Sequence, residues 1–294
     1  MNIFHHSFER NLYHMVKKMT IEKENNDLKI TEVQCLDIGL SVDCGQSFRW
    51  TINEEGLIHG IVKNKSIDII QKKDEIIFKN TTEEDFNILW KEYFDFERDY
   101  KKICDSFDDD NLKAACEEFP GIRILKQDEW ETICSFIISQ NNNIPRIKGI
   151  ISRLCETFGE KINETEYAFP SFEILSEKTS EELSPLRAGF RNKYIIDAAQ
   201  KFASGEIDVE RIKQLPLDEA REELKKIKGV GNKVADCSLL FGFGRVEAFP
   251  VDVWVKRVME ELYPGGLPSC TKGVEGIAQQ YLFHWRRHHD KNDN

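Results

Sequence analysis

The sequence lacks any run of apolar residues long enough to cross a membrane. A membrane-spanning helix needs roughly 18 or more such residues in succession, and no stretch of the 294-residue chain comes close. The first residues, MNIFHHSFERNLYHMVKKM, interrupt their apolar positions with histidine, glutamate and basic side chains, whereas a signal peptide needs a continuous apolar segment. We therefore expect a cytoplasmic protein without a membrane partner.

Closely spaced cysteines are missing as well. The eight cysteines are scattered along the chain, and no two of them form a C-x-x-C pair. This spacing indicates reduced thiols and argues against a disulfide framework or a cysteine-based zinc site.

An excess of basic residues is the third absence. The chain carries 52 acidic and 41 basic residues, which gives a formal net charge of −11. Proteins that bind polyanions usually present a basic face, so a nucleic-acid-binding function would need positive charge gathered in one place. With 40% hydrophobic and 11% aromatic residues, the chain can bury a sizeable core and is long enough for two domains.

The first hundred or so residues are predicted to contain an antiparallel sheet. Short runs rich in β-branched and aromatic residues, SFRWTINEEGLIHGIV, SIDIIQ and EIIFKN, are separated by polar turns, which is typical of a β-meander. A helix is expected next, in TTEEDFNILWKEYF, because Thr81 and Glu84 have the spacing of a capping box and apolar residues recur there at helical spacing.

Helical periodicity dominates the rest of the chain. A charged, poorly structured link is expected at 105–111, and helices are expected at 128–140, 144–159, 193–203 and 217–228. The predicted fold class is therefore α+β. It comprises an N-terminal extension over 1–27, an antiparallel sheet domain over 28–110 and an all-helical domain over 111–294.

Two glycines interrupt the helical spacing at Gly229-Val230-Gly231 and predict a helix, a tight hairpin and a second helix. The backbone N–H groups of such a hairpin, together with the positive end of the second helix, can bind a phosphate without a basic side chain. A purely structural helix-loop-helix is the alternative. Lys233 falls in the first turn of the second helix, where the helix dipole favours the neutral, nucleophilic amine. Its alternative role is that of a solvated surface lysine.

Asp252 follows Pro250 and precedes the helical run VWVKRVMEEL, which is the position of a helix N-cap. Capping and catalysis are compatible, because a capping carboxylate that also faces Lys233 can stabilise positive charge that develops between them.

The segment GVGNKVADCSLLF followed by PVDVWVKR resembles the helix-hairpin-helix-GPD superfamily of DNA glycosylases, and Lys233 stands at the position that marks members with both glycosylase and lyase activity. Four further motifs narrow the resemblance to 8-oxoguanine DNA glycosylases: CGQSFRW at 44–50, SQNNNIPRIKG at 139–149, AGFRNKY at 188–194 and GIAQQYLF at 276–283. The resemblance implies a TBP-like sheet domain, double-stranded DNA containing 8-oxoguanine as the partner, and a monomer that is nucleoid-associated in a prokaryote.

The resemblance assigns a lesion pocket to four residues. Gly45 would offer its carbonyl to the N7 hydrogen that 8-oxoguanine has and guanine lacks, and Gln279 would contact the Watson–Crick edge. Phe283 and Cys237 would sandwich the base. Spacing agrees, because Lys233 and Cys237 are four residues apart on one helix, and Gln279 and Phe283 on another. Without the resemblance, Phe283 would be a core aromatic residue, Cys237 a small buried residue and Gln279 a solvated helix residue.

The resemblance assigns a second set of residues to the DNA around the extruded base and to the opposite strand. Extrusion of the base costs stacking and pairing energy, and Asn141 would fill the space that the base leaves. Arg146 and Arg191 would bond the orphaned cytosine, and Phe190 would wedge into the base stack. Without the resemblance, the asparagines of QNNNIP indicate a helix C-terminal turn followed by a cap.

Three positions bear on the subfamily. Trp254 stands where many eukaryotic members carry a phosphate-binding histidine, and Arg286 stands where they carry its acidic partner. Iron–sulfur relatives need four closely spaced cysteines after the Asp252 helix. Only Cys270 lies there, which argues against the cluster-bearing members.

The resemblance thus implies a bifunctional enzyme without a redox cofactor or a catalytic metal. Lys233 would attack C1′ and displace the base, and β-elimination from the resulting Schiff base would cut the strand, with cytosine preferred opposite the lesion. Carbonyls of residues 225–231 are expected to hold a structural cation, as in relatives. Two alternatives remain: a monofunctional alkylated-base glycosylase of the same fold, which Lys233 argues against, and a non-catalytic hairpin module that only binds DNA, which the full pocket set argues against.

Overall fold

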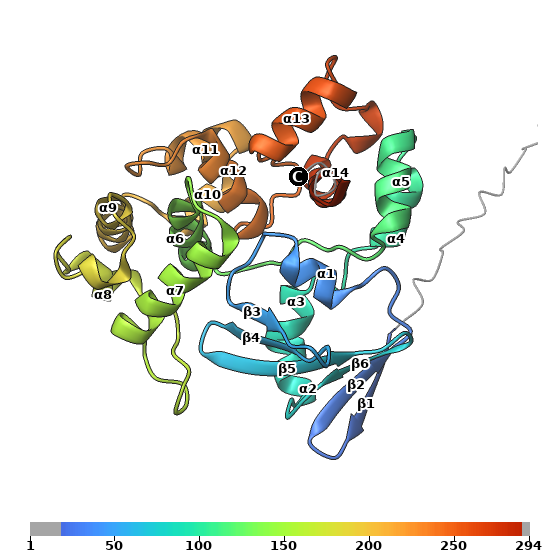
Figure 1. Cartoon of the computed structure of the whole chain (residues 1–294), viewed down its shortest axis with the longest axis horizontal. Helices are drawn as coiled ribbons and strands as arrows, with labels where there is room; N and C mark the ends of the chain where they lie inside the picture. The colour runs from blue at the N-terminus through green and yellow to red at the C-terminus, as the bar shows by residue number, and fades with distance from the viewer. Residues whose placement is uncertain (1–18, 290–294) are drawn as a thin grey trace, which may run out of the picture.

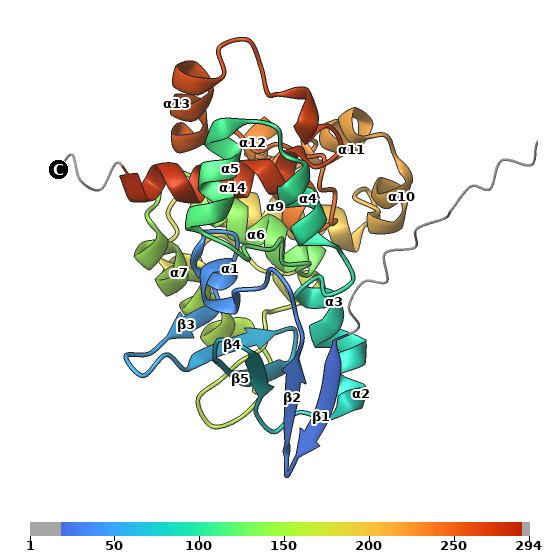
Figure 2. The ribbon, with the colours of Figure 1, turned by 90° about the vertical axis from the view of Figure 1, so that its right-hand side faces the viewer.

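A six-stranded antiparallel sheet forms one end of the molecule, and helices form the rest (Figure 1). This computed structural model describes residues 19–289. In the rotated view the sheet lies below, and α14 crosses the helical part above it (Figure 2). The predicted α+β fold is confirmed. No helix within 19–289 is long and apolar enough to cross a membrane.

The strands pair in the order β1-β2-β6-β5-β4-β3. The predicted meander is confirmed in the last four strands along the chain, and β1 and β2 extend the sheet beyond β6. β1 lies within the segment predicted as an extension, so the sheet starts before residue 28, while residues 1–18 of that segment lie outside the described residues. The strands are Thr20–Glu24 (β1), Asp27–Thr31 (β2), Trp50–Ile52 (β3), Ile58–Val62 (β4), Lys65–Gln71 (β5) and Glu75–Phe78 (β6).

A cross-strand pair between Trp50 and Gly60 anchors the edge of the sheet at β3. The two residues are directly opposite in the register, and the Trp50 ring covers Gly60 so closely that an added Cβ would lie 2.1 Å from it. The buried indole donates a hydrogen bond to the Tyr93 hydroxyl at 2.8 Å and packs edge-on against Phe94. The missing side chain at position 60 therefore lets the tryptophan join the sheet to the helix that follows it.

That helix consists of Glu83–Asp85 (α2), a π-helical turn at Phe86–Trp90 (η1) and Lys91–Tyr93 (α3). Its N-cap is Thr82, whose hydroxyl accepts a hydrogen bond from the backbone N–H of Asp85 at 3.0 Å, so the predicted capping box at Thr81 is wrong by one residue. Thr81 instead donates to the carbonyl of Lys79. Each threonine has an acidic residue three positions later, so the sequence pattern fits both positions, and the structure has the N-cap at Thr82.

The predicted link at 105–111 is also wrong, because this segment is ordered. It contains the end of α4 (Tyr100–Ser106) and the start of α5 (Asp110–Glu118). Phe107 between them is fully buried. Asp109 caps α5 and accepts a hydrogen bond from the Tyr263 hydroxyl at 2.6 Å. At least one acidic residue of the segment, Asp109, therefore serves as a helix cap, and the run of aspartates does not mark a solvated linker.

The helical part contains the helices predicted at 128–140, 144–159 and 193–203, each within two residues of the expected ends. The helix predicted at 217–228 ends four residues early, because the hairpin begins there. The remaining helices are Ile38–Asp43 (α1), Glu129–Ser139 (α6), Ile144–Phe158 (α7), Phe172–Ser176 (α8), Arg191–Ala203 (α9), Val209–Gln214 (α10), Leu217–Leu224 (α11), Asn232–Phe241 (α12), Val253–Leu262 (α13) and Glu275–His289 (α14), with 3₁₀ turns at Ser184–Leu186 (η2) and Ser269–Thr271 (η3).

The sheet and the helical part interlock along the chain. Cys44 and Phe48, from the loop after α1, are buried in the core of the helical part, and Leu125 is buried in the core of the sheet. Arg49 from the same loop reaches Glu131 of α6, with an Nη1–Oε2 distance of 3.4 Å. Burial raises the pKa of Glu131 to about 7 in spite of this arginine. The loop after α1 is therefore fixed by contacts with both parts.

We predict that Gly60→Ala lowers the free energy of unfolding by about 2–3 kcal/mol, because the new methyl group overlaps the Trp50 ring. Gly265→Ala is the matched control, since nothing lies within 4 Å of a Cβ there, and it should change stability by less than about 0.5 kcal/mol. Urea unfolding followed by tryptophan fluorescence measures both. Equal midpoints for the two variants would contradict this account of the sheet edge.

Candidate active site

The hairpin lies between the end of α11 and the start of α12, over residues 225–231. Gly229 has a φ of +80°, and a Cβ there would lie 2.3 Å from the Tyr194 ring, so both backbone and space require glycine. Gly231 is the N-cap of α12 with a φ of −101°, so only one of the two glycines uses its tolerance of positive φ. Gly229 and Gly231 are both exposed. The hairpin therefore presents its backbone and the N-terminal N–H groups of α12 at the surface, as a phosphate-binding site requires.

Lys233 lies in the first turn of α12, as predicted, and is half-buried. Its Nζ donates to the Ser139 hydroxyl at 3.3 Å and lies 4.9 Å from the centroid of the Phe136 ring. The Ser139 hydroxyl in turn donates to the carbonyl of Phe136 at 2.8 Å. These contacts hold the amine against the C-terminal end of α6. Neither Ser139 nor Phe136 was predicted as a site residue, although Ser139 directly precedes the QNNN run and Phe136 lies one turn earlier on α6.

Asp252 is the N-cap of α13, as predicted, and its carboxylate accepts a hydrogen bond from the N–H of Val255 at 2.8 Å. Its charge also acts on Cys237, a buried thiol one turn after Lys233. Burial raises the pKa of this thiol to about 11; the Lys233 ammonium lowers it and the Asp252 carboxylate raises it. Both charges therefore act on the same sulfur, and Lys233 lies one helical turn from it.

The other predicted pocket residues join the loop after α1 to α14. Gly45 has a φ of +81°, and a Cβ there would lie 3.4 Å from Cε1 of the Phe283 ring. Gln279 is buried, and its side-chain oxygen accepts a hydrogen bond from the amide of Gln280 at 2.8 Å. Gln280 accepts in turn from the Cys44 thiol at 3.2 Å. Gln280 was missed from the sequence, where it is adjacent to the residue that the resemblance singles out.

Two phenylalanines connect these two groups. Phe48, from the loop that carries Gly45, packs edge-on against Phe136 with ring centroids 5.7 Å apart. Phe136 is the ring that lies beneath Lys233. The four predicted pocket residues and the two predicted catalytic residues therefore converge on one region, where α6, α12, α13, α14 and the loop after α1 meet.

The three asparagines after α6 differ in their contacts. Asn142 donates to the carbonyl of Ile138 at 2.7 Å, and Asn143 caps α7 by accepting from the N–H of Arg146 at 3.0 Å. The interpretation as a turn followed by a cap is thus confirmed for these two. Asn141 has a φ of +51° and an exposed side chain, which no such local role explains.

Arg146, Phe190 and Arg191 lie near one another at the starts of α7 and α9. Phe190 is 52% exposed, and the Arg191 guanidinium lies 4.5 Å from its ring centroid. Arg191 itself is only 4% exposed and donates to the carbonyls of Gln140 and Ala188. Burial and the nearby positive charge of Arg146 lower its pKa. Arg146 is exposed. Of the two arginines predicted to bond a base, one is therefore largely occupied by the protein backbone.

Trp254 and Arg286, the two residues that depart from the family pattern, both contact other side chains of this protein. The ring of Trp254, half-buried in the first turn of α13, lies 5.2 Å from the Arg257 guanidinium. Arg286 forms an ion pair with Glu261 at 2.8 Å, which ties α14 to α13.

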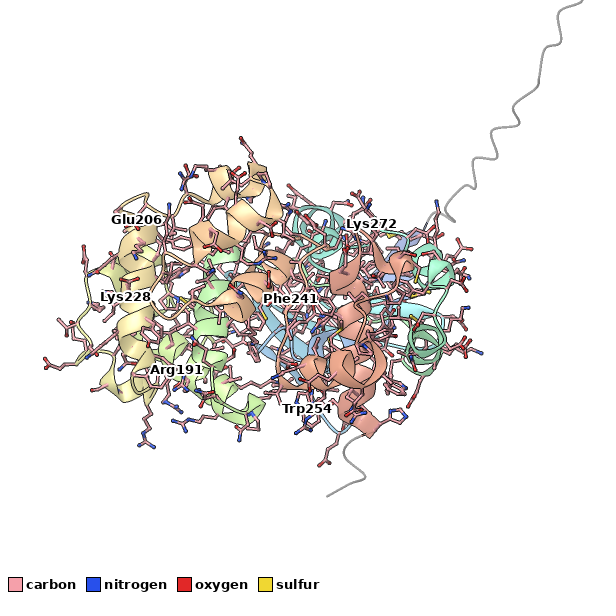
Figure 3. The ribbon with its side chains drawn as sticks, turned by 90° about the horizontal axis from the view of Figure 1, so that it is seen from above. Arg191, Glu206, Lys228, Phe241, Trp254 and Lys272 are labelled. Carbon is pink, nitrogen blue, oxygen red and sulfur yellow. The ribbon has the colours of Figure 1, made fainter. Side chains whose placement is uncertain are left out.

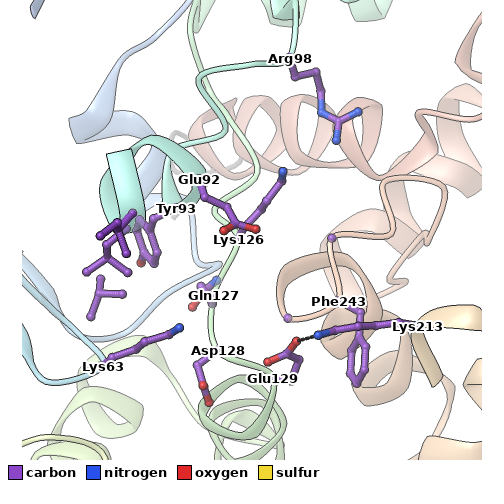
Figure 4. A pocket seen from close by; sticks show the side chains of 15 residues that line it. Lys63, Glu92, Tyr93, Arg98, Lys126, Gln127, Asp128, Glu129, Lys213 and Phe243 are labelled. Carbon is purple, nitrogen blue, oxygen red and sulfur yellow. Dashed lines mark ion pairs between the residues drawn. The ribbon is translucent and has the colours of Figure 1, made fainter. Parts of the chain in front are cut away.

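The candidate pocket is closed in this structure. Cys237 is 3% and Gln279 is 4% exposed, and the Phe283 ring packs on Gly45. A separate cavity of about 450 Å³ opens between α3, residues 126–129 and the loop after α12, where Lys213 pairs with Glu129 (Figure 4). Its lining contains none of the predicted site residues. A base therefore enters the candidate pocket only if Phe283 moves away from Gly45.

Comparisons with known proteins identify the family of this chain. Residues 27–133 match the family described as 8-oxoguanine DNA glycosylase, N-terminal domain, and residues 134–270 match the HhH-GPD superfamily base excision DNA repair protein. The N-glycosylase/DNA lyase of Saccharomyces cerevisiae is 31% identical over 251 residues, which cover 76% of this chain and 67% of the yeast protein.

Two solved structures are similar in fold. The Clostridium acetobutylicum 8-oxoguanine glycosylase/lyase, in complex with double-stranded DNA containing cytosine opposite to 8-oxoG, has a TM-score of 0.86 and 38% identity over 92% of this chain and 98% of that chain. A 3-methyladenine DNA-glycosylase from Archaeoglobus fulgidus has a TM-score of 0.66 over 88% of this chain and 98% of that chain, and its 19% identity shows the fold alone. The chain therefore belongs to the 8-oxoguanine DNA glycosylases of the helix-hairpin-helix-GPD superfamily.

Proposed function

We propose that this protein removes 8-oxoguanine from double-stranded DNA and then cuts the strand at the abasic site. The observation that carries the proposal is the half-buried amine of Lys233 in the first turn of α12, held against Ser139 and Phe136 at the end of α6 and one turn before the buried Cys237. The relatives named N-glycosylase/DNA lyase and 8-oxoguanine glycosylase/lyase support it. We further propose that the protein works as a monomer on chromosomal DNA in the cytoplasm.

The chemistry assigns a separate task to each of the two residues. The neutral amine of Lys233 attacks C1′ of the nucleotide, and the bond to the base breaks, with its electron pair leaving on the base. Positive charge that develops on the sugar in this step is stabilised by the Asp252 carboxylate. The C1′–O4′ bond of the sugar then breaks as the C=N bond forms, and the ring oxygen takes up the proton that the amine loses, which leaves an open-chain Schiff base. This Schiff base acidifies the hydrogen at C2′, and loss of that proton expels the 3′ phosphate by β-elimination.

Selection of the base rests on Gly45. Its carbonyl accepts a hydrogen bond from the N7–H of 8-oxoguanine, whereas in guanine the lone pair of N7 would face the same carbonyl without a hydrogen. Phe283 and Cys237 hold the two faces of the base, and Gln279 contacts its edge. Entry of the base replaces the contact between Phe283 and Gly45 by contacts of both residues with the base.

A monofunctional glycosylase for alkylated bases is the second candidate, because the Archaeoglobus relative has the same fold. Such an enzyme activates water and needs no amine at position 233. Reduction with borohydride during turnover separates the candidates, since only an enzyme that forms a Schiff base becomes covalently joined to 8-oxoguanine DNA.

Lys233→Gln should abolish base release, strand cleavage and the borohydride-trapped adduct together, because one amine carries all three. Binding of lesion-containing DNA should persist. Lys213→Gln is the matched control, since this lysine pairs with Glu129 and Glu210 outside the site. Single-turnover assays on an 8-oxoguanine duplex measure the effect, and normal excision by Lys233→Gln would refute the mechanism.

Asp252→Asn should slow single-turnover excision by roughly 100-fold or more, because the carboxylate charge is lost. Stability should fall by at most about 1 kcal/mol, because asparagine also caps a helix. Asp208→Asn removes the same charge from the N-cap of α10 and should leave the rate unchanged. If both variants cut at the wild-type rate, Asp252 is a cap and nothing more.

The preference for the opposite base should depend on Arg146. Its exposed guanidinium matches the N3 and O2 acceptors of an unpaired cytosine, whereas adenine would present an N6 donor to it. We expect excision opposite cytosine to exceed excision opposite adenine by roughly thirtyfold, and Arg146→Ala to reduce that ratio by about tenfold. Arg211→Ala, at an exposed arginine paired with Glu223, is the control. Similar wild-type rates on all four opposite bases would refute the assignment of Arg146.

A further inference from the structure

The hairpin lies on a single face of α9. Tyr194, Asp197 and Lys201 follow the i, i+3, i+7 spacing of one helix face. The Tyr194 ring lies beneath Gly229, and the other two side chains bind the backbone of the hairpin. Three residues of one helix thus contact the turn at three successive points along the chain.

Asp197 binds the middle of the turn. Its Oδ2 accepts a hydrogen bond from the backbone N–H of Lys228 at 2.8 Å, and its Oδ1 lies 3.4 Å from Nζ of the same residue. The side chain is only 12% exposed. Burial acts to raise its pKa, but the hydrogen bonds from Lys228 and Lys201 outweigh burial and hold the pKa below its usual value. The carboxylate is therefore charged at neutral pH.

Lys201 binds the start of the turn. Its ammonium donates to the backbone carbonyl of Lys226 and lies 3.2 Å from the Asp197 carboxylate. The side chain is 19% exposed, so this contact is partly shielded from water. An ammonium in this position neutralises the partial negative charge of a carbonyl as a metal ion would.

These contacts bear on the cation expected at the carbonyls of residues 225–231. The Lys226 carbonyl is bound by Lys201, and the Ile227 carbonyl accepts a hydrogen bond from the N–H of Val230 at 3.1 Å. Two carbonyls of the turn are therefore bound by protein donors, one of them by a positive charge, and each keeps only its second lone pair for any other ligand.

We propose that the Asp197–Lys201 pair takes the place of a structural cation and holds the hairpin in its DNA-binding shape without a metal ion. The inference rests on the proposed function, because it takes the hairpin as the contact with the DNA backbone. Both residues are positioning residues, which act on DNA only through the turn. Figure 3 shows Lys228 beside α9, between Arg191 at the start of that helix and Glu206 beyond its end.

The test compares DNA binding with and without added cations. The substrate is a duplex with a tetrahydrofuran abasic analogue opposite cytosine, and its dissociation constant is measured by fluorescence anisotropy at fixed ionic strength, in EDTA or with Ca²⁺. Wild-type protein should bind equally under both conditions. Lys201→Met keeps the apolar stem but loses the ammonium, and should bind roughly tenfold more weakly in EDTA, with part of the loss recovered in Ca²⁺ as the Lys226 carbonyl becomes available.

Lys213→Met is the matched control, because Lys213 lies between Glu129 and Glu210 as Lys201 lies between Asp197 and Glu206, but its ion-pair partners include no hairpin residue. It should bind as the wild type does. Wild-type binding that weakens in EDTA, or Lys201→Met binding that equals the wild type, would overturn the proposal. Weak binding by Lys201→Met that Ca²⁺ leaves unchanged would also overturn it, because the loss would then be one of folding and not of charge. If the wild type itself does not bind the analogue, the proposed function fails and not the inference about the hairpin.

Discussion

The contact between the Phe283 ring and the backbone at Gly45 joins α14, the last helix, to the loop after α1, and the candidate pocket depends on this contact. The loop that carries Gly45 is held in place by the buried side chain of Gln46. Its amide donates to the carbonyls of Ser41 and Arg123 at 2.8 and 2.7 Å, and its oxygen accepts from the N–H of Leu125 at 2.9 Å. A buried amide satisfied at both ends fixes a loop firmly, because breaking any one bond leaves an unpaired polar group.

The positions of the residues proposed to carry the chemistry were predictable from the sequence because they follow from local patterns. The Gly-x-Gly hairpin, the first turn that holds Lys233 and the cap at Asp252 each require only the order of neighbouring residues, and the structure has all three. The meander was predictable for the same reason, since its strands are separated by short polar turns. β1 and β2 escaped notice because their sequence, TIEKENNDLKIT, is mostly polar, although Leu28 and Ile30 alternate correctly and Asn25 occupies the left-handed turn between the strands.

What the sequence could not show depends on contacts between distant residues. The burial of Arg191 follows from a carbonyl 51 positions earlier, at Gln140. The contact between Asp197 and Lys228 spans 31 positions. Neither partner has an unusual neighbourhood in the sequence, so no local pattern could indicate that an arginine assigned to DNA is bound by the backbone, or that a lysine and an aspartate support the hairpin.

Helix α9 sets the distance between two of the proposed DNA contacts. Its N-cap residue, Phe190, is exposed over the buried Arg191, and its far half supports the hairpin through Lys201. The ten residues between Arg191 and Lys201 span about 15 Å of rigid helix, which equals the rise of roughly four base pairs of B-form DNA at 3.4 Å each. In the proposed function, Phe190 probes the base stack and the hairpin holds the DNA backbone. The distance between these two proposed contacts is set by the length of one helix, and an insertion or deletion of a helical turn there would shift one relative to the other by more than one base pair.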